Sequence, residues 1–254
     1  MRRASSELEV YDADTLILQR HLVIKGLVWP TDMTSSDKFK CLYISDGGYI
    51  SGTNRFIHRV EPNGKTIKWP TVDIPFSLSV SLDMSNVIVI YRETRKLKEF
   101  TTNGVLKREV DLPEVLVNAS HAVQLPSGRI VVSHGDGSDE ITRVCLLEDG
   151  GRVTKCYGDR RGSGEGQLNF PIRLTVDQDG SILIIDVNNK RVLRLSASLD
   201  DVTEIISRSD IIALWYPYRM YLQTMRRRVF IAECQWDGQN KTWINGELLT
   251  YRIN

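Results

Sequence analysis

The sequence predicts an all-β fold, a six-bladed β-propeller that lacks the first two strands of its first blade. Three observations carry this prediction: a unit of about 45 residues that recurs along the chain, apolar runs of strand length within each unit, and turn-forming dipeptides between the runs. No window shows a comparably sustained period of 3.6 residues, which an amphipathic helix needs. Repetition therefore sets the fold class before any single residue is considered.

The clearest copy of the unit is FPIRLTVDQDGSILIIDVNNKRVLRL, residues 170–195, and four weaker copies align with it. Position A is the residue two after a proline or its replacement, and position B is the polar residue that ends an apolar run. Position A holds Asp32, Ser77, His121, Arg173 and Arg219, and position B holds Asp46, Arg92, His134, Asp186 and Glu233. Successive B positions lie 46, 42, 52 and 47 residues apart, which is the range of propeller blades.

Each unit supplies the strands of one blade. Runs such as SILII and VIVI are rich in β-branched residues, and a second run such as RVLRLS follows them. Dipeptides that tolerate positive φ fall at the joints, namely Asn63-Gly64, Asn103-Gly104, Ser127-Gly128 and Asp179-Gly180. We expect one domain over residues 1–254, divided into the outer half of blade 1 (7–26), blade 2 (27–71), blade 3 (72–114), blade 4 (115–168), blade 5 (169–211) and blade 6 (212–254).

The first blade is expected to be incomplete. The segment LEVYDADTLILQRHLVIK, residues 8–25, aligns with the second halves of the other units and has no strand pair before it. The final segment, GELLTYRIN, resembles a third strand without a fourth. Six blades of about 45 residues need about 270 residues, and the chain has 254. We therefore expect a truncated piece or an incomplete gene model.

The segment from Gly162 to Leu195 resembles the NHL repeat. A glycine-rich lead (GSGEG) is followed by Phe170-Pro171, by VDQDG, by a strand that ends in Asp186, and by NKRV. The other copies keep the spacing of the repeat but have different residues at many of the motif positions. The resemblance implies a six-bladed domain that binds proteins or single-stranded RNA, as at the carboxyl end of some tripartite-motif ubiquitin ligases. It also implies that the acidic B residues, Asp46, Asp186 and Glu233, tie the backbone of a turn.

Position A predicts the surface that meets a partner. Equivalent residues of a propeller point to the same rim, so the five A residues are expected to surround one mouth of the channel, with Tyr218 and Trp215 nearby as stacking groups. Two arginines and a histidine there suit a phosphate, an acidic peptide or single-stranded RNA. The alternative is that these side chains bond loop carbonyls and neighbouring carboxylates of the fold itself.

The overall charge argues against bulk electrostatic binding of nucleic acid. The formal net charge is +1, whereas domains held to nucleic acid in that way are commonly much more basic. Local basic clusters do exist at Arg160-Arg161, at Arg226-Arg227-Arg228, and at Arg92, Arg95, Lys96 and Lys98. Solvated charges at turns are the simpler interpretation of all three.

Catalysis is not expected, and neither is a metal or a cofactor. A catalytic zinc needs at least three converging ligands, and of His21, His58, His121 and His134 only His121 occupies position A. The predicted function is a protein-interaction platform, the substrate-recruiting part of a ubiquitin ligase pathway. Any ligase activity would need a RING domain, whose cysteines this chain lacks. Single-stranded RNA binding is the alternative, and a metal-dependent hydrolase or lyase is a less favoured one.

The predicted location is the cytoplasm. Cys41, Cys145, Cys156 and Cys234 form no C-x-x-C motif. Cys145 and Cys156 could face each other across adjacent strands, but strand thiols of cytosolic propellers are more often small buried apolar groups. The chain has no apolar run of 18 residues, and MRRASSELEV has no apolar core typical of a signal peptide. We expect a monomer that binds a protein or an acidic peptide and does not bind a membrane.

Overall fold

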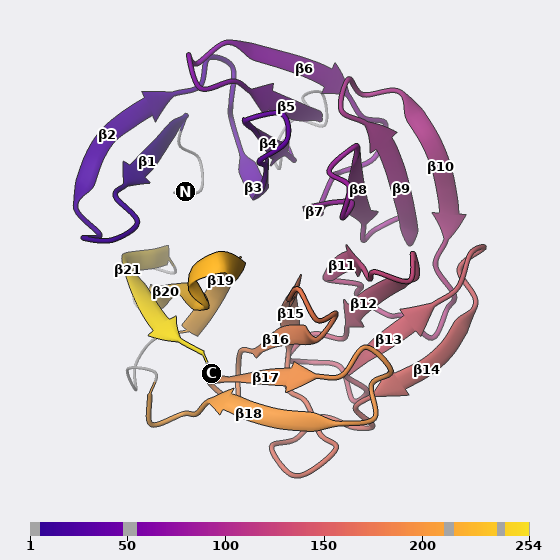
Figure 1. Cartoon of the computed structure of the whole chain (residues 1–254). Coiled ribbons are helices and arrows are strands. Elements are labelled where there is room, and N and C mark those ends of the chain that lie inside the picture. The colour runs from indigo at the N-terminus through magenta and orange to yellow at the C-terminus, as the bar shows by residue number, and fades with distance from the viewer. Residues whose placement is uncertain (1–5, 48–54, 211–215, 238–241, 254) are drawn as a thin grey trace. The chain divides into compact units, whose positions relative to one another are not determined.

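The computed structural model describes residues 6–47, 55–210, 216–237 and 242–253, and these residues form an all-β β-propeller with five blades (Figure 1). Four blades are four-stranded sheets and the fifth has three strands. Among the described residues the one helix is the single-turn η1 (Thr224–Arg226). The predicted number of six blades is therefore wrong. Residues 7–26 contain a two-stranded sheet, the strand pair predicted for an outer half-blade, and no inner strands join it in the part of the chain that the structure describes.

The chain divides into two compact units, Met1–Leu112 and Pro113–Asn254. The first unit contains the hairpin of β1 (Glu7–Tyr11) and β2 (Leu18–Val23). Its first blade consists of β3 (Pro30–Ser36), β4 (Cys41–Asp46), β5 (Phe56–Val60) and β6 (Thr66–Pro70), and its second of β7 (Ser77–Val80), β8 (Asn86–Tyr91), β9 (Lys96–Thr101) and β10 (Leu106–Asp111). Every neighbouring pair of strands is antiparallel and follows the order of the chain.

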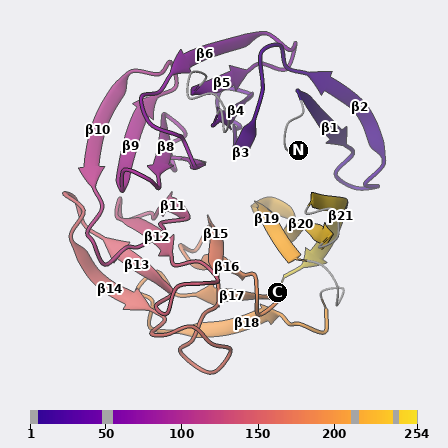
Figure 2. The ribbon, with the colours of Figure 1, turned by 180° about the vertical axis from the view of Figure 1, so that it is seen from behind.

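The second unit contains three blades, and Figure 2 shows their strands from behind. They are formed by β11 (His121–Gln124), β12 (Ile130–His134), β13 (Arg143–Leu147) and β14 (Val153–Tyr157), by β15 (Pro171–Val176), β16 (Ile182–Asp186), β17 (Arg191–Leu195) and β18 (Val202–Ile206), and by β19 (Tyr216–Gln223), β20 (Arg228–Asp237) and β21 (Thr242–Arg252). The last blade has no fourth strand among the described residues.

Burial along the strands explains the sequence pattern. The second strands are apolar almost throughout, and every residue of β8 (NVIVIY) and β16 (ILIID) is buried. Each second strand lies between two other strands, and both of its faces contact apolar side chains. Its sequence is therefore a nearly continuous apolar run. The fourth strands are mostly exposed, as in β10 (LKREVD), where only Val110 is buried. This difference makes the second strands the clearest signal in the sequence.

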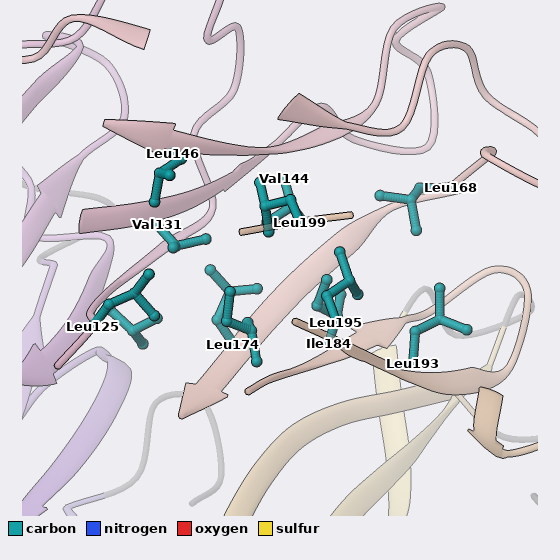
Figure 3. Packing of buried hydrophobic residues seen from close by; sticks show 12 residues of the cluster. Leu125, Val131, Val144, Leu146, Leu168, Leu174, Ile184, Leu193, Leu195 and Leu199 are labelled. Atoms are coloured by element: carbon teal, nitrogen blue, oxygen red, sulfur yellow. The ribbon is translucent and has the colours of Figure 1, made fainter. Parts of the chain in front are cut away.

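Apolar side chains of adjacent blades form the cores. In the second unit, Leu125, Val131 and Leu146 pack with Leu174 and Ile184 between the sheets of β11–β14 and β15–β18 (Figure 3). In the first unit the corresponding cluster includes Tyr43, Trp69, Val89 and Tyr91. Each contact between blades is thus an interdigitated apolar layer, the usual arrangement of sheets packed face to face.

The glycines of the predicted turns have left-handed backbone conformations. Gly64, Gly104, Gly128 and Gly180 have φ between 82° and 84°. Gly104 is also sterically constrained, because a Cβ atom there would lie 2.5 Å from the Trp69 side chain. Turn chemistry therefore places the hairpins where the dipeptides predicted them. Within the described residues no helix has the length and apolar character needed to cross a bilayer.

Candidate functional site

The strand register tests the alignment of the repeats directly. In four blades the A residue pairs with the residue just before B: Asp32 with Ser45, His121 with Ser133, Arg173 with Ile185, and Arg219 with Ala232. In the blade β7–β10, Ser77 pairs with Ile90, two residues before the predicted B residue Arg92. This pairing makes Tyr91, and not Arg92, the B residue of the blade β7–β10. The sequence rule missed it because the apolar run of that blade includes its terminal tyrosine.

Four of the five A residues are buried, which differs from an open rim of partner-binding side chains. The exposed fractions are 0% for Asp32, 3% for Ser77, 5% for His121 and 6% for Arg173, while Arg219 is partly exposed. Side chains buried to this extent offer almost no surface to a partner. Direct partner contact through these four residues is therefore disfavoured.

Two A residues bond the backbone of the following blade. Oδ2 of Asp32 accepts a hydrogen bond of 2.7 Å from the Leu78 amide, one residue beyond Ser77. Nδ1 of His121 accepts a bond of 3.3 Å from the Leu174 amide, one residue beyond Arg173. The same position thus makes the same contact in both units, although one residue is an aspartate and the other a histidine. Both residues serve the fold, as the alternative interpretation held, but their partners here are backbone amides and not the loop carbonyls and carboxylates that it named.

The B aspartates accept bonds from the backbone of the segment that enters their own blade. Asp46 accepts bonds from the amides of Val28 (3.0 Å) and Trp29 (2.7 Å). Asp186 accepts a bond of 2.7 Å from the Asn169 amide. Glu233 is also a B residue and is 2% exposed. All three carboxylates are buried, and those of Asp46 and Asp186 tie a connecting segment to the end of a second strand.

The pKa values of the two B aspartates are shifted in opposite directions. Burial alone raises the pKa of Asp46, but the nearby His58 imidazole and bonds from two backbone amides outweigh it, and the net pKa is lowered. His58 is fully buried, and its Nε2 lies 3.4 Å from Oδ2 of Asp46. For Asp186 burial dominates and the pKa is raised, despite bonds from Asn189, the Asn169 amide and Arg191. Neither carboxylate is open to a substrate.

The NHL-like motif forms one connected network. Nε of Arg191 lies 2.9 Å from Asp186, and the same guanidinium donates to the carbonyls of Ser163 and Gln167. Asn189 donates to Asp186 and to the Gly162 carbonyl. The glycine-rich lead is therefore held by the asparagine and the arginine of the motif. This arrangement gives each of these motif residues a structural role.

The basic clusters are largely paired with carboxylates. Lys96 contacts Glu109 and Asp111, and Lys98 contacts Asp73 and Glu109. Other residues of the clusters serve the backbone, since Nε of Arg227 donates to the Ile253 carbonyl and Arg161 donates to the Gly137 carbonyl. These contacts favour the simpler interpretation of the clusters as solvated or paired turn charges.

Arg219 and Tyr218 are the accessible members of the predicted rim. The Arg219 guanidinium lies 4.4 Å from the centroid of the Tyr218 ring, and Nη1 donates to the Tyr218 carbonyl. Both residues are partly exposed. Trp215, the other predicted stacking group, lies outside the described residues. The Tyr218–Arg219 pair therefore stays a prediction for partner contact, in the second unit alone.

An exposed apolar cluster on the blade β11–β14 was missed by the sequence reasoning. Val115, Val117 and Ile141 have exposed fractions of 43%, 48% and 44%, and we call these three residues the 115–141 patch. Leu116 between the two valines is fully buried, so both valines point outward. The patch joins two loops, because the Val117 carbonyl accepts a 2.9 Å bond from Gly135, and Gly135 lies against the Ile141 carbonyl. Sequence alone gave no signal, because isolated valines in a connector look like ordinary strand residues.

The loops that carry the patch are held by side-chain bonds, and exposed charged residues occur in the neighbouring segments. Oδ2 of Asp139 accepts bonds from the Asn118 amide group (2.9 Å) and from the Asp136 backbone (2.6 Å). Glu114, Glu140, Arg160 and Arg161 are exposed in the same segments, and the Arg161 amide donates to the Glu140 carbonyl. An apolar centre with a charged rim is the usual anatomy of a protein interface.

Cys145 and Cys156 form a disulfide between the adjacent strands β13 and β14. The two residues are direct cross-strand partners, with Cα atoms 4.0 Å apart. The expectation of two separate buried thiols is therefore wrong, because the register places the side chains opposite each other. Disulfides are typical of oxidising compartments, so this one argues against the reducing compartment that the cysteine pattern predicted. Cys41 is a buried free thiol.

No group of three or more metal-ligating side chains occurs among the described residues. His121 bonds the Leu174 amide, and His58 lies beside Asp46, so these two imidazoles serve the fold. His134 is buried, and burial lowers its pKa to about 4.

Comparisons with known proteins identify the fold. No family model and no curated protein matches the chain. A protein of unknown function from Bacteroides caccae matches with a TM-score of 0.73 and 10% identity over 99% of this chain and 88% of that one. A chain of the nidogen/laminin complex matches with a TM-score of 0.69 and 12% identity over 96% and 91%. Virginiamycin B lyase from Staphylococcus aureus matches with a TM-score of 0.57 and 18% identity over 88% and 70%. At these identities the likeness shows the propeller fold alone.

Proposed function

We propose that this chain is a non-catalytic protein-interaction propeller of the NHL type, and that a partner protein binds the 115–141 patch. The patch is the observation that carries the proposal. Its three apolar side chains are 43–48% exposed on loops that internal bonds fix in place. Three exposed apolar side chains with charged residues in neighbouring segments favour a protein partner over a small substrate.

The NHL assignment is supported by the network around Asp186. The aspartate, asparagine and arginine of the motif hold the glycine-rich lead through specific bonds, so each motif residue has a structural reason to be there. One similar structure, a chain of the nidogen/laminin complex, comes from a complex between proteins. Recruitment of a substrate in a ubiquitin ligase pathway is the form that the sequence predicted, but the Cys145–Cys156 disulfide disfavours the reducing compartment in which such a pathway operates. The proposal is therefore protein binding in general.

Site-specific photo-crosslinking tests the proposal. A photoreactive amino acid replaces Val117 or Ile141, and Val202 serves as the matched control because it is an exposed valine on β18 of the same unit. We expect one protein to be crosslinked from positions 117 and 141 and not from 202. With that protein purified, Val117→Asp/Ile141→Asp should weaken binding about tenfold or more, since a buried interface centre carries most of the affinity, while Val202→Asp should not.

The alternative of single-stranded RNA has a distinct outcome in the same system. Short oligonucleotides would bind with an affinity that falls steeply with salt, and Arg219→Glu would abolish that binding while the patch variants would not. Such a result would replace the protein-platform proposal. Equal crosslinking from positions 117, 141 and 202, or unchanged affinity of the double variant, would also contradict it.

A further inference from the structure

An accessible arginine of the first unit is held in position without a carboxylate partner. Arg59 is the fourth residue of β5 and is partly exposed. Its Nη1 donates a hydrogen bond of 3.0 Å to Oδ1 of Asn103, and its guanidinium lies 5.8 Å from the centroid of the Phe39 ring. Among the described residues it forms no ion pair with a carboxylate. A guanidinium carries five N–H donors, so most of its capacity to bind an anion is unused.

The acceptor that orients this guanidinium is itself placed by packing. Asn103 lies in the turn between β9 and β10, and Gly104 after it has a φ of 84°. A Cβ atom at Gly104 would lie 2.5 Å from the side chain of Trp69, which is 7% exposed. The turn therefore rests directly on β6. Because the arginine is ordered before any ligand arrives, binding costs less side-chain entropy.

Two exposed apolar side chains lie beside the guanidinium. Phe39, which contacts it, is 37% exposed. Ile67 is 40% exposed and is the direct cross-strand partner of Arg59, and the side chains of such partners lie on one face of the sheet about 5 Å apart. We call these three residues the Phe39–Ile67 site. It combines one oriented cation with apolar surface on loops and strands of the same unit.

Positive charge prevails around this site. Lys38 and Lys40 flank Phe39 in the turn between β3 and β4, and the guanidinium adds a third cation. The carboxylates close to the ring are Asp37, in the same turn, and Asp83, whose backbone carbonyl accepts a bond from Lys38. The carboxylate of Asp83 already accepts bonds from two serine hydroxyls of its own turn. This balance favours an anionic ligand.

The contacts of the aromatic ring favour an acidic peptide over a nucleic acid. The ammonium of Lys38 and the guanidinium of Arg59 lie over the Phe39 ring, 5.6 and 5.8 Å from its centroid. A nucleobase that stacked on the ring would compete with these cations for it. A carboxylate instead binds the N–H groups of the guanidinium, and an apolar side chain next to it can pack on Ile67 at the same time.

We propose that the Phe39–Ile67 site binds an acidic segment of a partner protein. An aspartate or glutamate of that segment accepts hydrogen bonds from the Arg59 guanidinium, and a neighbouring large apolar residue packs against Phe39 and Ile67. The site lies in the first unit and the 115–141 patch lies in the second. The inference does not rest on that patch and stands or falls by its own experiment.

Selection from a library of random peptides displayed on phage tests the proposal. Wild type and Arg59→Gln are immobilised in parallel, and Arg20→Gln is the matched control because Arg20 is an exposed arginine on β2 of the same unit. We expect wild type and Arg20→Gln to enrich sequences in which an acidic residue adjoins a large apolar one. Arg59→Gln should not enrich them.

Fluorescence anisotropy with the most enriched peptide then measures each contact. Glutamine in place of its acidic residue should weaken binding about tenfold or more, because a charge-assisted hydrogen bond is lost. This comparison leaves the protein unaltered and so does not depend on how a variant folds. Ile67→Asp should weaken binding to a similar extent, and Leu18→Asp should not, since Leu18 is 41% exposed on β2. Circular dichroism checks that both variants fold.

Three results would overturn the proposal. The first is that wild type enriches no acidic peptides beyond those that Arg59→Gln enriches. The second is equal affinity of the acidic peptide and its glutamine counterpart. The third is that a single-stranded oligouridine binds wild type more tightly than the peptide and loses this binding in Arg59→Gln, which would make the site one for nucleic acid.

Discussion

At the scale of single residues, position A determines how consecutive blades are held together. Asp32 and His121 lie at or near the start of the first strand of their blades. Each accepts a hydrogen bond from a backbone amide in the first strand of the following blade. A buried amide that loses its acceptor costs about 1–3 kcal/mol. These side chains are thus expected to matter for stability.

Replacing Asp32 tests this contact. The Asp32 carboxylate accepts hydrogen bonds from the backbone amides of Leu78 and Met33. Asp32→Ala removes the acceptor of both bonds. We expect a loss of about 2 kcal/mol in the free energy of unfolding, measured by urea denaturation. Asp37→Ala is the control, because Asp37 is exposed in the turn of the same blade and should change stability by less than about 0.5 kcal/mol. Equal effects of the two variants would remove the bonding role of Asp32.

His134 should give the protein a specific pH dependence. Burial lowers its pKa to about 4, with Arg143 acting in the same direction and the Val117 backbone and Asp139 opposing. An unfolded histidine binds its proton near pH 6.5. Between these values the unfolded chain holds more protons, so stability falls as the pH drops from about 6.5 to about 4, by on the order of 3 kcal/mol.

The difference between wild type and His134→Gln isolates that dependence. Urea denaturation at pH 7 and at pH 4.5 should show a smaller loss for His134→Gln than for the wild type. His21→Gln should keep the full loss, since its side chain is 49% exposed. An identical loss in the wild type and His134→Gln would show that His134 is accessible to protons in the folded state.

The sequence predicted some of these residue roles and missed others for physical reasons. Asp186 and its bonds follow from the motif, because its partners lie within 20 residues of it. The contact from Asp32 to Leu78 spans 46 residues, and sequence shows neither the burial of position A nor its acceptor role. The shift from Arg92 to Tyr91 arose because a tyrosine can end a buried strand as well as a charged residue can.

At the scale of elements, the glycine-rich lead depends on β17 through Arg191. The Arg191 side chain is 13% exposed and connects Asp186 to two carbonyls of the lead. We expect Arg191→Met to release the lead, and trypsin to cleave faster at Arg160 and Arg161 in a time course. Arg208→Met is the control, because Arg208 is exposed at the end of β18, and it should leave cleavage at these arginines unchanged. Unchanged cleavage in both variants would contradict the role of the motif.

The disulfide is the second feature at this scale. It closes a loop of 11 residues between β13 and β14, for which the chain-entropy account gives about 2–3 kcal/mol. Cys156→Ser should lower the midpoint of urea unfolding accordingly, and reduction of the wild type should do the same. Non-reducing peptide mapping should recover Cys145 linked to Cys156. Recovery of both as free thiols from protein kept under oxidising conditions would contradict the pairing.

At the scale of the whole molecule, the repeat predicted the propeller and missed its blade count. The strand pairs and glycine turns recur because each blade has the same packing requirement. The five blades therefore correspond to the five units, four of which begin with a proline. The segment 7–26 was predicted as an outer strand pair without inner strands, and it contains such a pair; because no inner strands join it among the described residues, it does not count as a sixth blade. The 115–141 patch could not be predicted from the sequence, because the exposure of a side chain depends on tertiary contacts that the sequence does not show.

The protein-platform proposal predicts where a partner leaves its footprint on the molecule. Hydrogen–deuterium exchange of the purified protein, alone and with the crosslinked partner, measures this footprint at every described amide. The account predicts slower exchange in residues 113–120 and 135–141, which carry Val115, Val117 and Ile141. Unchanged exchange in both segments, with protection around Tyr218 and Arg219 instead, would contradict it.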